Sequence, residues 1–232
     1  MILIPSGKAV IGSSLEERRK ICERWNVHPT WLAPEGPKQE IAVKAFLIDR
    51  FPVTNEQFVR FCEETAHPWI WLDGVRRELG KTARHPVALV NIDDARAYAR
   101  WERKRLPTAG EWEYAARGPE GWHYPWGNSW NPARCNNNSR ETAGGQGPTP
   151  VDAYPEGCSP FGVMDMTGNL CEWTGSPYPA SKGGNSRIVK GGFWKQAAEY
   201  RFRPAAVIMS QLGGNQQNYI GFRCATDAPE DV

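Results

Sequence analysis

The residues that could do metal or redox chemistry in this chain begin with its six cysteines. They are widely and irregularly spaced, at Cys22, Cys62, Cys135, Cys158, Cys171 and Cys224. A structural zinc site favours a Cys-x-x-Cys pair, and the sequence contains none. The spacing therefore favours free, mostly buried thiols in a reducing compartment, with a disulfide framework as the alternative.

The histidines also lack the spacing of a metal-binding or catalytic motif. The four histidines are His28, His67, His85 and His123, and none stands in a His-x-x-x-His arrangement. No Ser/His/Asp order and no Gly-rich phosphate loop rises above chance. We therefore interpret the histidines as ordinary loop or packing residues.

Three helices are predicted from their N-terminal capping signals. Thr54 with Gln57, and Thr108 with Glu111, form capping boxes, while Asn91 precedes two aspartates that the helix dipole favours. The third helix is expected to stop at Gly118-Pro119. Apolar residues at helical spacing behind these caps are predicted to face the core: Phe58, Phe61 and Cys62, then Ala95, Tyr98 and Ala99, then Trp112, Ala115 and Ala116.

The rest of the chain reads as loops and short strands. The segment 122–160 is dense in Gly, Pro, Asn and Trp without any period, and its aromatic side chains need burial. Something must order this segment, and a bound cation is a reasonable candidate. Strands are predicted at 187–190 and 219–224, and no domain boundary is visible.

Composition excludes several classes of function. The formal charge is only +2, from 28 basic and 26 acidic side chains, with no block of like charge. We therefore expect no nucleic-acid partner. No apolar run approaches the roughly 18 residues of a membrane span, so no membrane insertion is expected. The N-terminus lacks the pattern of a signal peptide, which predicts cytoplasmic synthesis.

A series of motifs runs along the chain in a fixed order. They are IPSG at 4–7, IGS at 11–13, FLIDR at 46–50, VTNEQF at 53–58, RLPT at 105–108, EWEYAARG at 111–118, YPWG at 124–127, PVD at 150–152, GNLCEWT at 168–174, KGGFW at 190–194 and IGFR at 220–223. Each is weak alone, but together they resemble the formylglycine-generating-enzyme (sulfatase-modifying factor) family. The resemblance implies one α+β domain over residues 1–232 with a C-type-lectin-like fold. It further implies a small twisted antiparallel sheet, two main helices and long loops supported by calcium.

The resemblance also shows what is missing for catalysis. The family's enzymes oxidise a substrate cysteine with copper held by two of their own cysteines, shortly after a Gly-Gly segment. The matching run here, GGFWKQAAEYRFR at 191–203, contains no cysteine. Soft thiolates hold cuprous ion, and Lys195, Gln196 and Glu199 cannot replace them. The iron-dependent sulfoxide synthases of the family need a histidine-rich motif that is also absent. We therefore predict a chain that is not an enzyme and binds no copper.

Structural calcium is the cofactor that the resemblance implies. One site would lie on the turn 165–172, with side chains of Asp165 and Glu172 and carbonyls of Gly168 and Leu170 as ligands. Two carboxylates that bracket a tight turn suit calcium, and the alternative is that they hydrogen-bond to loop amides.

A second calcium site would use Asn136 and Asn137, with help from the loop at 141–145. The family's aspartate has no clear match there, because Ala143 stands in its place.

One branch of the family, the variable proteins of diversity-generating retroelements, suggests a function in binding. These proteins carry a variable C-terminal region that ends at an Ile-Gly-Phe-Arg motif, and residues 193–223 fit that layout. Amides and aromatic rings make adaptable contact surfaces, and an exposed Val-Ile-Met patch would be costly unless it served recognition. The alternative is that these side chains only pack a loop. The candidate binding residues are Phe193, Lys195, Gln196, Glu199, Val207, Ile208, Met209, Gln211, Asn215, Gln217 and Tyr219.

Three functions follow in order of preference. The first is a display protein that binds a protein or cell-surface ligand, with display on a phage particle or a cell surface left open. The second is an accessory or regulatory domain that partners another enzyme. The third is a metal-dependent oxidase with an unrecognised site.

Overall fold

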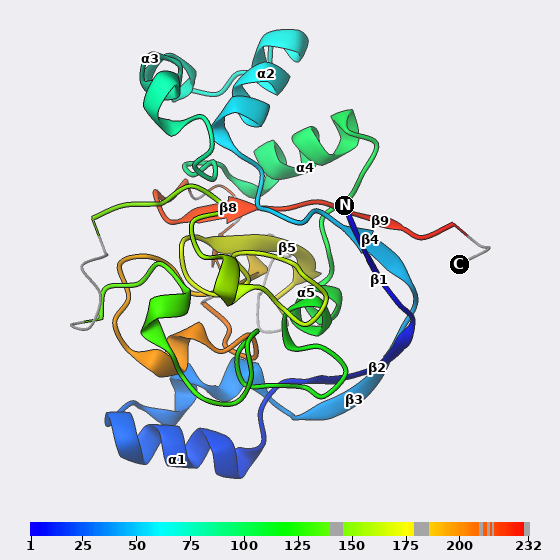
Figure 1. The fold of residues 1–232 in the computed structure, drawn as a ribbon, viewed down its shortest axis with the longest axis vertical. Coiled ribbons are helices and arrows are strands. Elements are labelled where there is room, and N and C mark those ends of the chain that lie inside the picture. Colours follow the sequence, from blue (N-terminus) through cyan, green and yellow to red (C-terminus); the bar gives the residue numbers. More distant parts are fainter. Residues whose placement is uncertain (140–145, 179–185, 209–210, 213, 215, 230–232) are drawn as a thin grey trace.

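The computed structural model describes residues 1–139, 146–178, 186–208, 211–212, 214 and 216–229. In this part of the chain nine short strands form three sheets (Figure 1). The first sheet has the order β1 (Ile2–Ile4), β4 (Phe46–Ile48), β9 (Ala225–Asp227), and the second pairs β2 (Gly7–Ile11) with β3 (Gln39–Val43). The third has the order β7 (Gln211–Leu212), β6 (Ser186–Lys190), β5 (Cys171–Pro177), β8 (Ile220–Phe222).

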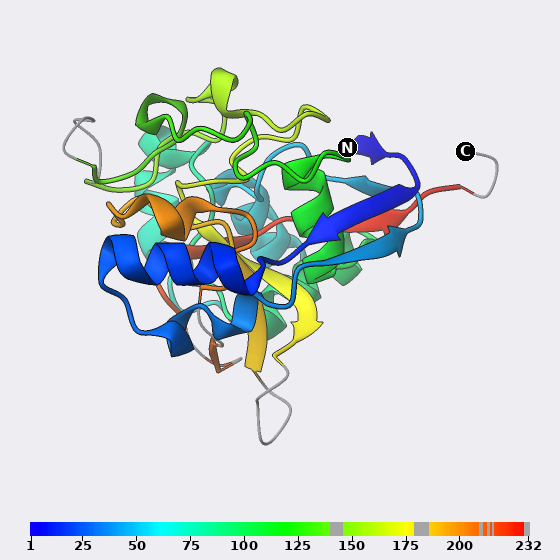
Figure 2. The ribbon, with the colours of Figure 1, turned by 90° about the horizontal axis from the view of Figure 1, so that it is seen from below.

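Five α-helices surround the sheets in the described residues. They are α1 (Leu15–Trp25), α2 (Asn55–Thr65), α3 (Leu72–Thr82), α4 (Ile92–Trp101) and α5 (Ala109–Arg117). Short 3₁₀ helices are η1 (Pro29–Trp31), η2 (Ala33–Glu35), η3 (Pro132–Arg134), η4 (Pro155–Gly157) and η5 (Glu199–Phe202). Helices α2, α3 and α4 lie at one end of the molecule and α1 at the other (Figure 1). Strands β2 and β3 form a ribbon along one side (Figure 2).

The three predicted helices are confirmed with their caps. Thr54, Asn91 and Thr108 each cap a helix through a complete capping box, and α5 ends at Gly118. All nine residues predicted to face the core are at most 3% exposed. The predicted strands at 187–190 and 219–224 correspond to β6 and β8.

The structure differs from the sequence expectation in its helix count and strand directions. Helices α1 and α3 were not predicted, because neither contains a fully buried residue and the apolar period is therefore weak. The pairing of β5 with β8 is parallel, whereas a purely antiparallel sheet was expected. A parallel pair needs a long crossover, and the chain supplies one between β5 and β8.

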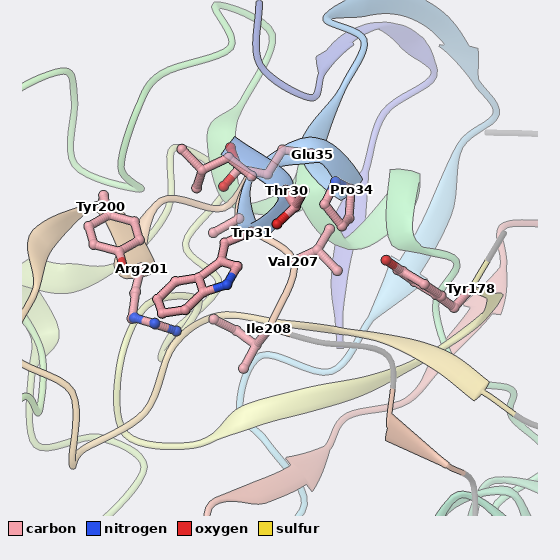
Figure 3. A pocket seen from close by; sticks show the side chains of 11 residues that line it. Thr30, Trp31, Pro34, Glu35, Tyr178, Tyr200, Arg201, Val207 and Ile208 are labelled. Carbon is pink, nitrogen blue, oxygen red and sulfur yellow. The ribbon is translucent and has the colours of Figure 1, made fainter. Parts of the chain in front are cut away.

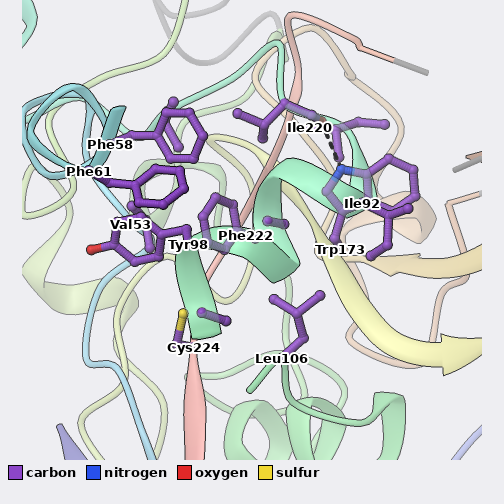
Figure 4. Close-up of a cluster of buried hydrophobic side chains, with 14 of the residues drawn as sticks. Val53, Phe58, Phe61, Ile92, Tyr98, Leu106, Trp173, Ile220, Phe222 and Cys224 are labelled. Carbon is purple, nitrogen blue, oxygen red and sulfur yellow. Dashed lines mark hydrogen bonds between the residues drawn. The ribbon is translucent and has the colours of Figure 1, made fainter. Parts of the chain in front are cut away.

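Two hydrophobic cores lie on opposite faces of β5. Trp173 points into the first core, between β5 and helices α2 and α4, where its Nε1 donates to the Val90 carbonyl at 2.9 Å (Figure 4). Phe58 packs edge-on against Phe222 in the same core. Glu172 precedes Trp173 and faces α5, where Trp112 Nε1 donates to its Oε2 at 2.9 Å. The alternation of side chains along a strand thus assigns one β5 face to apolar packing and the other to a buried polar group.

The aromatic side chains of segment 122–160 are ordered by ring packing. Trp130 stacks on Phe202 at a centroid distance of 5.0 Å, and Tyr124 stacks on Trp126 at 5.6 Å. These rings and buried Cys135 form a third apolar cluster. All six cysteines are free and four are buried, as predicted. No helix among the described residues is long and apolar enough to cross a membrane.

Candidate ligand-binding groove

A groove of about 390 Å³ lies beside η1 and η2, where the chain segment 200–208 crosses them (Figure 3). Tyr200 and Arg201 lie at one end and Tyr178 at the other, with Pro34 and Val207 between them (Figure 3). The remaining lining residues are Thr30, Trp31, Leu32, Glu35, Ala206 and Ile208. Its volume falls within the range of small-ligand pockets, although at its lower end.

A buried ion pair holds the two walls of the groove together. Arg203 Nη2 contacts both carboxylate oxygens of Glu35, at 2.8 and 2.9 Å, across 168 positions of sequence. Ser13 Oγ donates to the same carboxylate at 2.9 Å. Because Glu35 ends η2 and Arg203 follows η5, this pair positions η1 against the 200–208 segment.

Glycine lets the chain enter the groove wall after β6. Gly191 and Gly192 have φ angles of 107° and 67°, which other residues adopt only with strain. A Cβ on Gly192 would lie 2.9 Å from the Phe202 ring and 3.1 Å from the Arg201 carbonyl. The two glycines thus allow a sharp turn directly after β6, before the 193–203 run.

The exposed side of the groove is rich in rings and cations. Trp31 is 58% exposed, and the Arg201 guanidinium lies 5.7 Å from its ring centroid and 5.3 Å from that of Tyr200. The Trp25 ring lies against the Tyr200 ring, with their centroids 5.8 Å apart. Tryptophan, tyrosine and arginine are the residue types that dominate binding energy at interfaces.

Two of the predicted binding residues line this groove. Val207 is half-buried on its wall, and Ile208 follows it. The expectation of an exposed apolar patch is wrong for Ile208, which is only 7% exposed and belongs to the first core. Its amide donates to the Val189 carbonyl at 2.9 Å, so it continues the sheet edge and packs inward.

Other predicted binding residues lie elsewhere. Phe193 stacks on Tyr219 with centroids 4.2 Å apart, and both pack against the first core. Lys195 is exposed, with its Nζ 5.5 Å from the Trp194 ring centroid. Glu199 forms an ion pair with Arg24 at 2.7 Å.

The remaining members of the predicted set are amides or fall outside the described residues. Gln196 accepts from the Phe193 amide at 3.4 Å, and Gln217 accepts through its carbonyl from the Leu89 amide at 3.0 Å. Met209 and Asn215, like the side chain of Gln211, lie outside the described residues.

The groove wall opposite the 200–208 segment was not predicted from the sequence. Trp31, Pro34 and Tyr178 come from segments that carry no motif of the retroelement type. The only available signal was the tryptophan in a proline-flanked turn, and many tryptophans in this chain are buried for packing alone.

Burial raises the pKa of several thiols, including that of Cys135, which packs in one cluster with Phe202 of the 191–203 run. Cys171 and Cys224 are fully buried, and burial raises the pKa of each thiol well above its ordinary value. The Cys171 thiol donates to the Tyr219 carbonyl at 3.1 Å. Among the described residues no group of three or more His, Cys, Asp or Glu side chains is placed to hold a metal. The cuprous site implied by the resemblance would use thiolates, and burial favours the protonated form of Cys171 and Cys224.

Glu172 does not fit a calcium ligand in this arrangement. It is 0% exposed, and Arg223 donates to both of its oxygens, from Nη2 at 2.7 Å and from Nε at 2.8 Å. Trp112 donates to the same Oε2 at 2.9 Å. The carboxylate therefore serves as the partner of a buried ion pair, and three donors occupy three of its roughly four lone pairs.

Asp165 lies on the same turn but is less fully paired. Its Oδ2 accepts from Asn169 Nδ2 at 2.8 Å. Burial raises the pKa of this carboxyl to about 7, although the Asn169 hydrogen bond and the Arg223 charge act in the opposite direction. Gly168 donates its amide to the Gly191 carbonyl at 2.7 Å, and Leu170 is buried, so both shape this turn.

The second predicted calcium site contains an unpaired oxygen. Asn136 is 1% exposed, and its Oδ1 has no hydrogen-bond donor among the described residues. Its Nδ2 donates to the Gly147 carbonyl at 2.9 Å. Asn137 accepts through Oδ1 from the Ser139 amide at 2.9 Å. The loop 141–145, with Ala143, lies outside the described residues. A buried amide oxygen without a hydrogen-bond partner is a suitable ligand for calcium.

The fold and these sites define a C-type-lectin-like domain of the formylglycine-generating-enzyme type. The model of the sulfatase-modifying factor enzyme 1-like domain matches residues 1–228. The chain therefore belongs to that family.

Relatives in the family include both inactive and active proteins. The chain is 30% identical over 280 residues to the inactive Cα-formylglycine-generating enzyme 2 of Bos taurus, covering 98% of this chain and 88% of the relative. It is 31% identical over 276 residues to the formylglycine-generating enzyme of Mycobacterium tuberculosis, covering 83% of this chain and 91% of the relative.

Solved structures show the same fold at lower identity. PvdO from Pseudomonas aeruginosa superimposes with a TM-score of 0.74 and 22% identity, covering 97% of this chain and 93% of that one. Treponema denticola variable protein 1 superimposes with a TM-score of 0.72 and 17% identity, covering 98% and 95%.

Proposed function

We propose that this chain is a non-enzymatic ligand-binding member of the family, and that it binds a protein or other macromolecular ligand in the groove beside η1 and η2. The observation that carries the proposal is the composition of the 191–208 segment. Where the resemblance places copper-binding cysteines, this segment contains none, and it contributes Tyr200, Arg201, Val207 and Ile208 to the groove.

The absence of suitable thiolates supports a role without catalysis. Cys171 and Cys224 lie in or next to the motifs that precede and follow KGGFW in the sequence. Both are buried, and burial raises the pKa of each thiol. A thiol that stays protonated is a poor ligand for cuprous ion. The similarity to an inactive relative is in keeping with this role.

We propose further that residues 193–223 are the diversified region of a retroelement target protein. In the described part of this window, Val207 and Arg201 line the groove, while Phe193 and Tyr219 form a separate stacked pair. The test is the neighbouring DNA, where we expect a reverse-transcriptase gene and an adenine-substituted copy of the codons for 193–223. A single fixed copy beside a gene for a partner enzyme would instead favour an accessory domain.

Calcium completes the proposal as a structural cofactor at the Asn136 site. The supporting observation is the buried Asn136 Oδ1 that lacks a donor among the described residues. Asn136 and Asn137 would hold the ion, and its role would be to fix the loops around them.

Binding in the groove is tested by panning a random 12-residue peptide phage library on immobilised protein. Trp31→Ala should abolish capture of the selected peptides, because Trp31 supplies an exposed ring at the groove. Ile70→Ala is the control, since Ile70 is an apolar side chain that is 77% exposed and lies just before α3 at the opposite end of the molecule. Peptides that bind both variants as well as the unchanged protein would overturn the groove as the binding site.

A further inference from the structure

We propose that the groove recognises a carboxylate of its ligand, and that Arg201 is the residue that binds it. The occupant we infer is an acidic peptide segment of a partner protein, in which a carboxylate side chain stands next to an apolar one. This inference rests on the proposed function and specifies the chemistry of its ligand.

Arg201 is a cation held in place without a counter-charge. Its guanidinium lies between two rings, 5.7 Å from the Trp31 centroid and 5.3 Å from the Tyr200 centroid. Among the described residues it donates no side-chain hydrogen bond and forms no ion pair. Stacking on rings fixes the plane of a guanidinium while its five N–H groups stay available.

The acids that could neutralise Arg201 are used elsewhere. Glu199 is paired with Arg24 at 2.7 Å. Glu35 lines the groove, but both its oxygens are taken by Arg203 at 2.8 and 2.9 Å, and Ser13 donates to it as well. Among its described lining residues, the groove therefore carries one positive charge that no acid neutralises, at its Trp31 end.

The rest of the groove favours an apolar neighbour for that carboxylate. Pro34, Val207 and Ile208 line the wall between Arg201 and Tyr178 (Figure 3). Apolar walls exclude water and strengthen a charged hydrogen bond formed beside them. A volume of about 390 Å³ has room for a few side chains of a peptide and not for a folded element.

A carboxylate fits better than a phosphate. The guanidinium fork matches the two oxygens of one carboxylate in a bidentate pair. Phosphate sites usually gather several cations or a helix N-terminus, and Arg201 is the one unpaired cation that lines this groove among the described residues.

The experiment uses a labelled 12-residue peptide obtained by panning on the full chain. Its twin carries Asn or Gln in place of each Asp or Glu, and fluorescence anisotropy gives the dissociation constant of each peptide. We expect the acidic peptide to bind at least about tenfold more tightly than its twin at low salt. That ratio should shrink as salt is raised, since the groove is open to solvent.

Variants assign the preference to one residue. Arg201→Leu should reduce the ratio to about one, and Arg201→Lys should restore part of it, because a point charge replaces the fork. Arg77→Leu removes the same charge from exposed α3 at the other end of the molecule and should leave the ratio unchanged.

The outcomes separate the two proposals. A ratio near one in the unchanged protein, with binding still dependent on Trp31, overturns the carboxylate inference and leaves groove binding intact. A preference that survives Arg201→Leu overturns the inference as well. If panning yields no peptide that depends on Trp31, the proposed function itself fails.

Discussion

Two arginines of this chain show how differently the scaffold and the groove are built. Arg223 is 0% exposed and donates to Glu172 at 2.7 and 2.8 Å, to the Met164 carbonyl at 2.8 Å and to the Asp49 carbonyl at 3.2 Å. Arg201 lies at the groove and has no such partner among the described residues. The fold therefore saturates the N–H groups of Arg223 within the scaffold, whereas those of Arg201 stay available at the groove, where a ligand can reach them.

Glu113, a buried acid of the scaffold, shows the same saturation. Glu113 accepts from Arg117 Nη1 at 2.7 Å, from Lys190 Nζ at 2.8 Å and from the Gly12 amide at 2.7 Å. These contacts join the N-terminal ribbon, α5 and β6. Networks with every member paired fix one arrangement, so changes in them should affect folding, whereas changes in the groove should affect binding.

The largest predicted effect contrasts the two arginines directly. Arg223→Met leaves Glu172 buried without its partner and should lower the free energy of unfolding by about 3–5 kcal/mol. Arg201→Met should lower it by about 1 kcal/mol or less, because contacts to two rings are weakened but no described polar partner is lost. Urea denaturation of both variants measures the contrast. Equal losses would show that Arg201 belongs to the scaffold.

The next effect concerns the pH dependence of Asp165. Its pKa is raised from 3.8 to about 7, mainly by burial, so between these pH values the folded state holds a proton that the unfolded state has released. Its contribution to stability is therefore full below about pH 4 and lost as pH rises through about 7. At about 1.4 kcal/mol per pKa unit, the span approaches about 4 kcal/mol.

Asp165→Asn should remove this part of the pH dependence. The measurement compares the free energy of unfolding of the two proteins at pH 5 and pH 7.5 in buffer with EDTA. The unchanged protein should lose more stability than the variant on going to pH 7.5. Parallel losses would mean that Asp165 stays ionised in the folded state.

Calcium should stabilise the chain through Asn136. At a free concentration of 100 times its dissociation constant, an ion that binds only the folded state adds about 2.7 kcal/mol. The midpoint of thermal unfolding should rise with calcium and fall with EDTA, and Asn136→Leu should remove that response. An equal response in the variant would place the ion elsewhere, and no response in the unchanged protein would remove calcium from the account.

The smallest effect belongs to the helix caps. Asn91 Oδ1 accepts from the Asp93 and Asp94 amides at 2.8 and 2.9 Å, and Asn91→Ala should cost about 1 kcal/mol. Peptide binding in the groove should not change, since α4 lies at the other end of the molecule (Figure 1). A loss of peptide binding in this variant would show that the scaffold and the groove are not independent.

Local signals allowed three of the five α-helices and two of the nine strands in the described residues to be predicted from the sequence. The caps at Thr54, Asn91 and Thr108 act within one helical turn. The start of each helix can therefore be predicted from a few neighbouring residues. Helix α1 has an equally good capping box at Ser14, but its apolar face is too weak to be recognised.

The groove could not be predicted in the same way. Trp31 and Arg201 lie close together where the Glu35–Arg203 ion pair joins segments 168 positions apart. Ile208 was predicted to be an exposed recognition residue, but its amide N–H donates a hydrogen bond to the Val189 carbonyl and its side chain packs into the core. Tertiary contacts of this kind leave no period or spacing in the sequence.

The most direct test of the central claim asks whether the missing cysteines end the family's oxidative chemistry. The purified full chain is given one equivalent of cuprous ion against a competing chelator, and then a cysteine-containing peptide under oxygen, with the product followed by mass spectrometry. The account predicts that the chelator keeps the copper and that the peptide thiol is not converted to an aldehyde. One tightly held cuprous ion per chain, together with aldehyde formation, would contradict it.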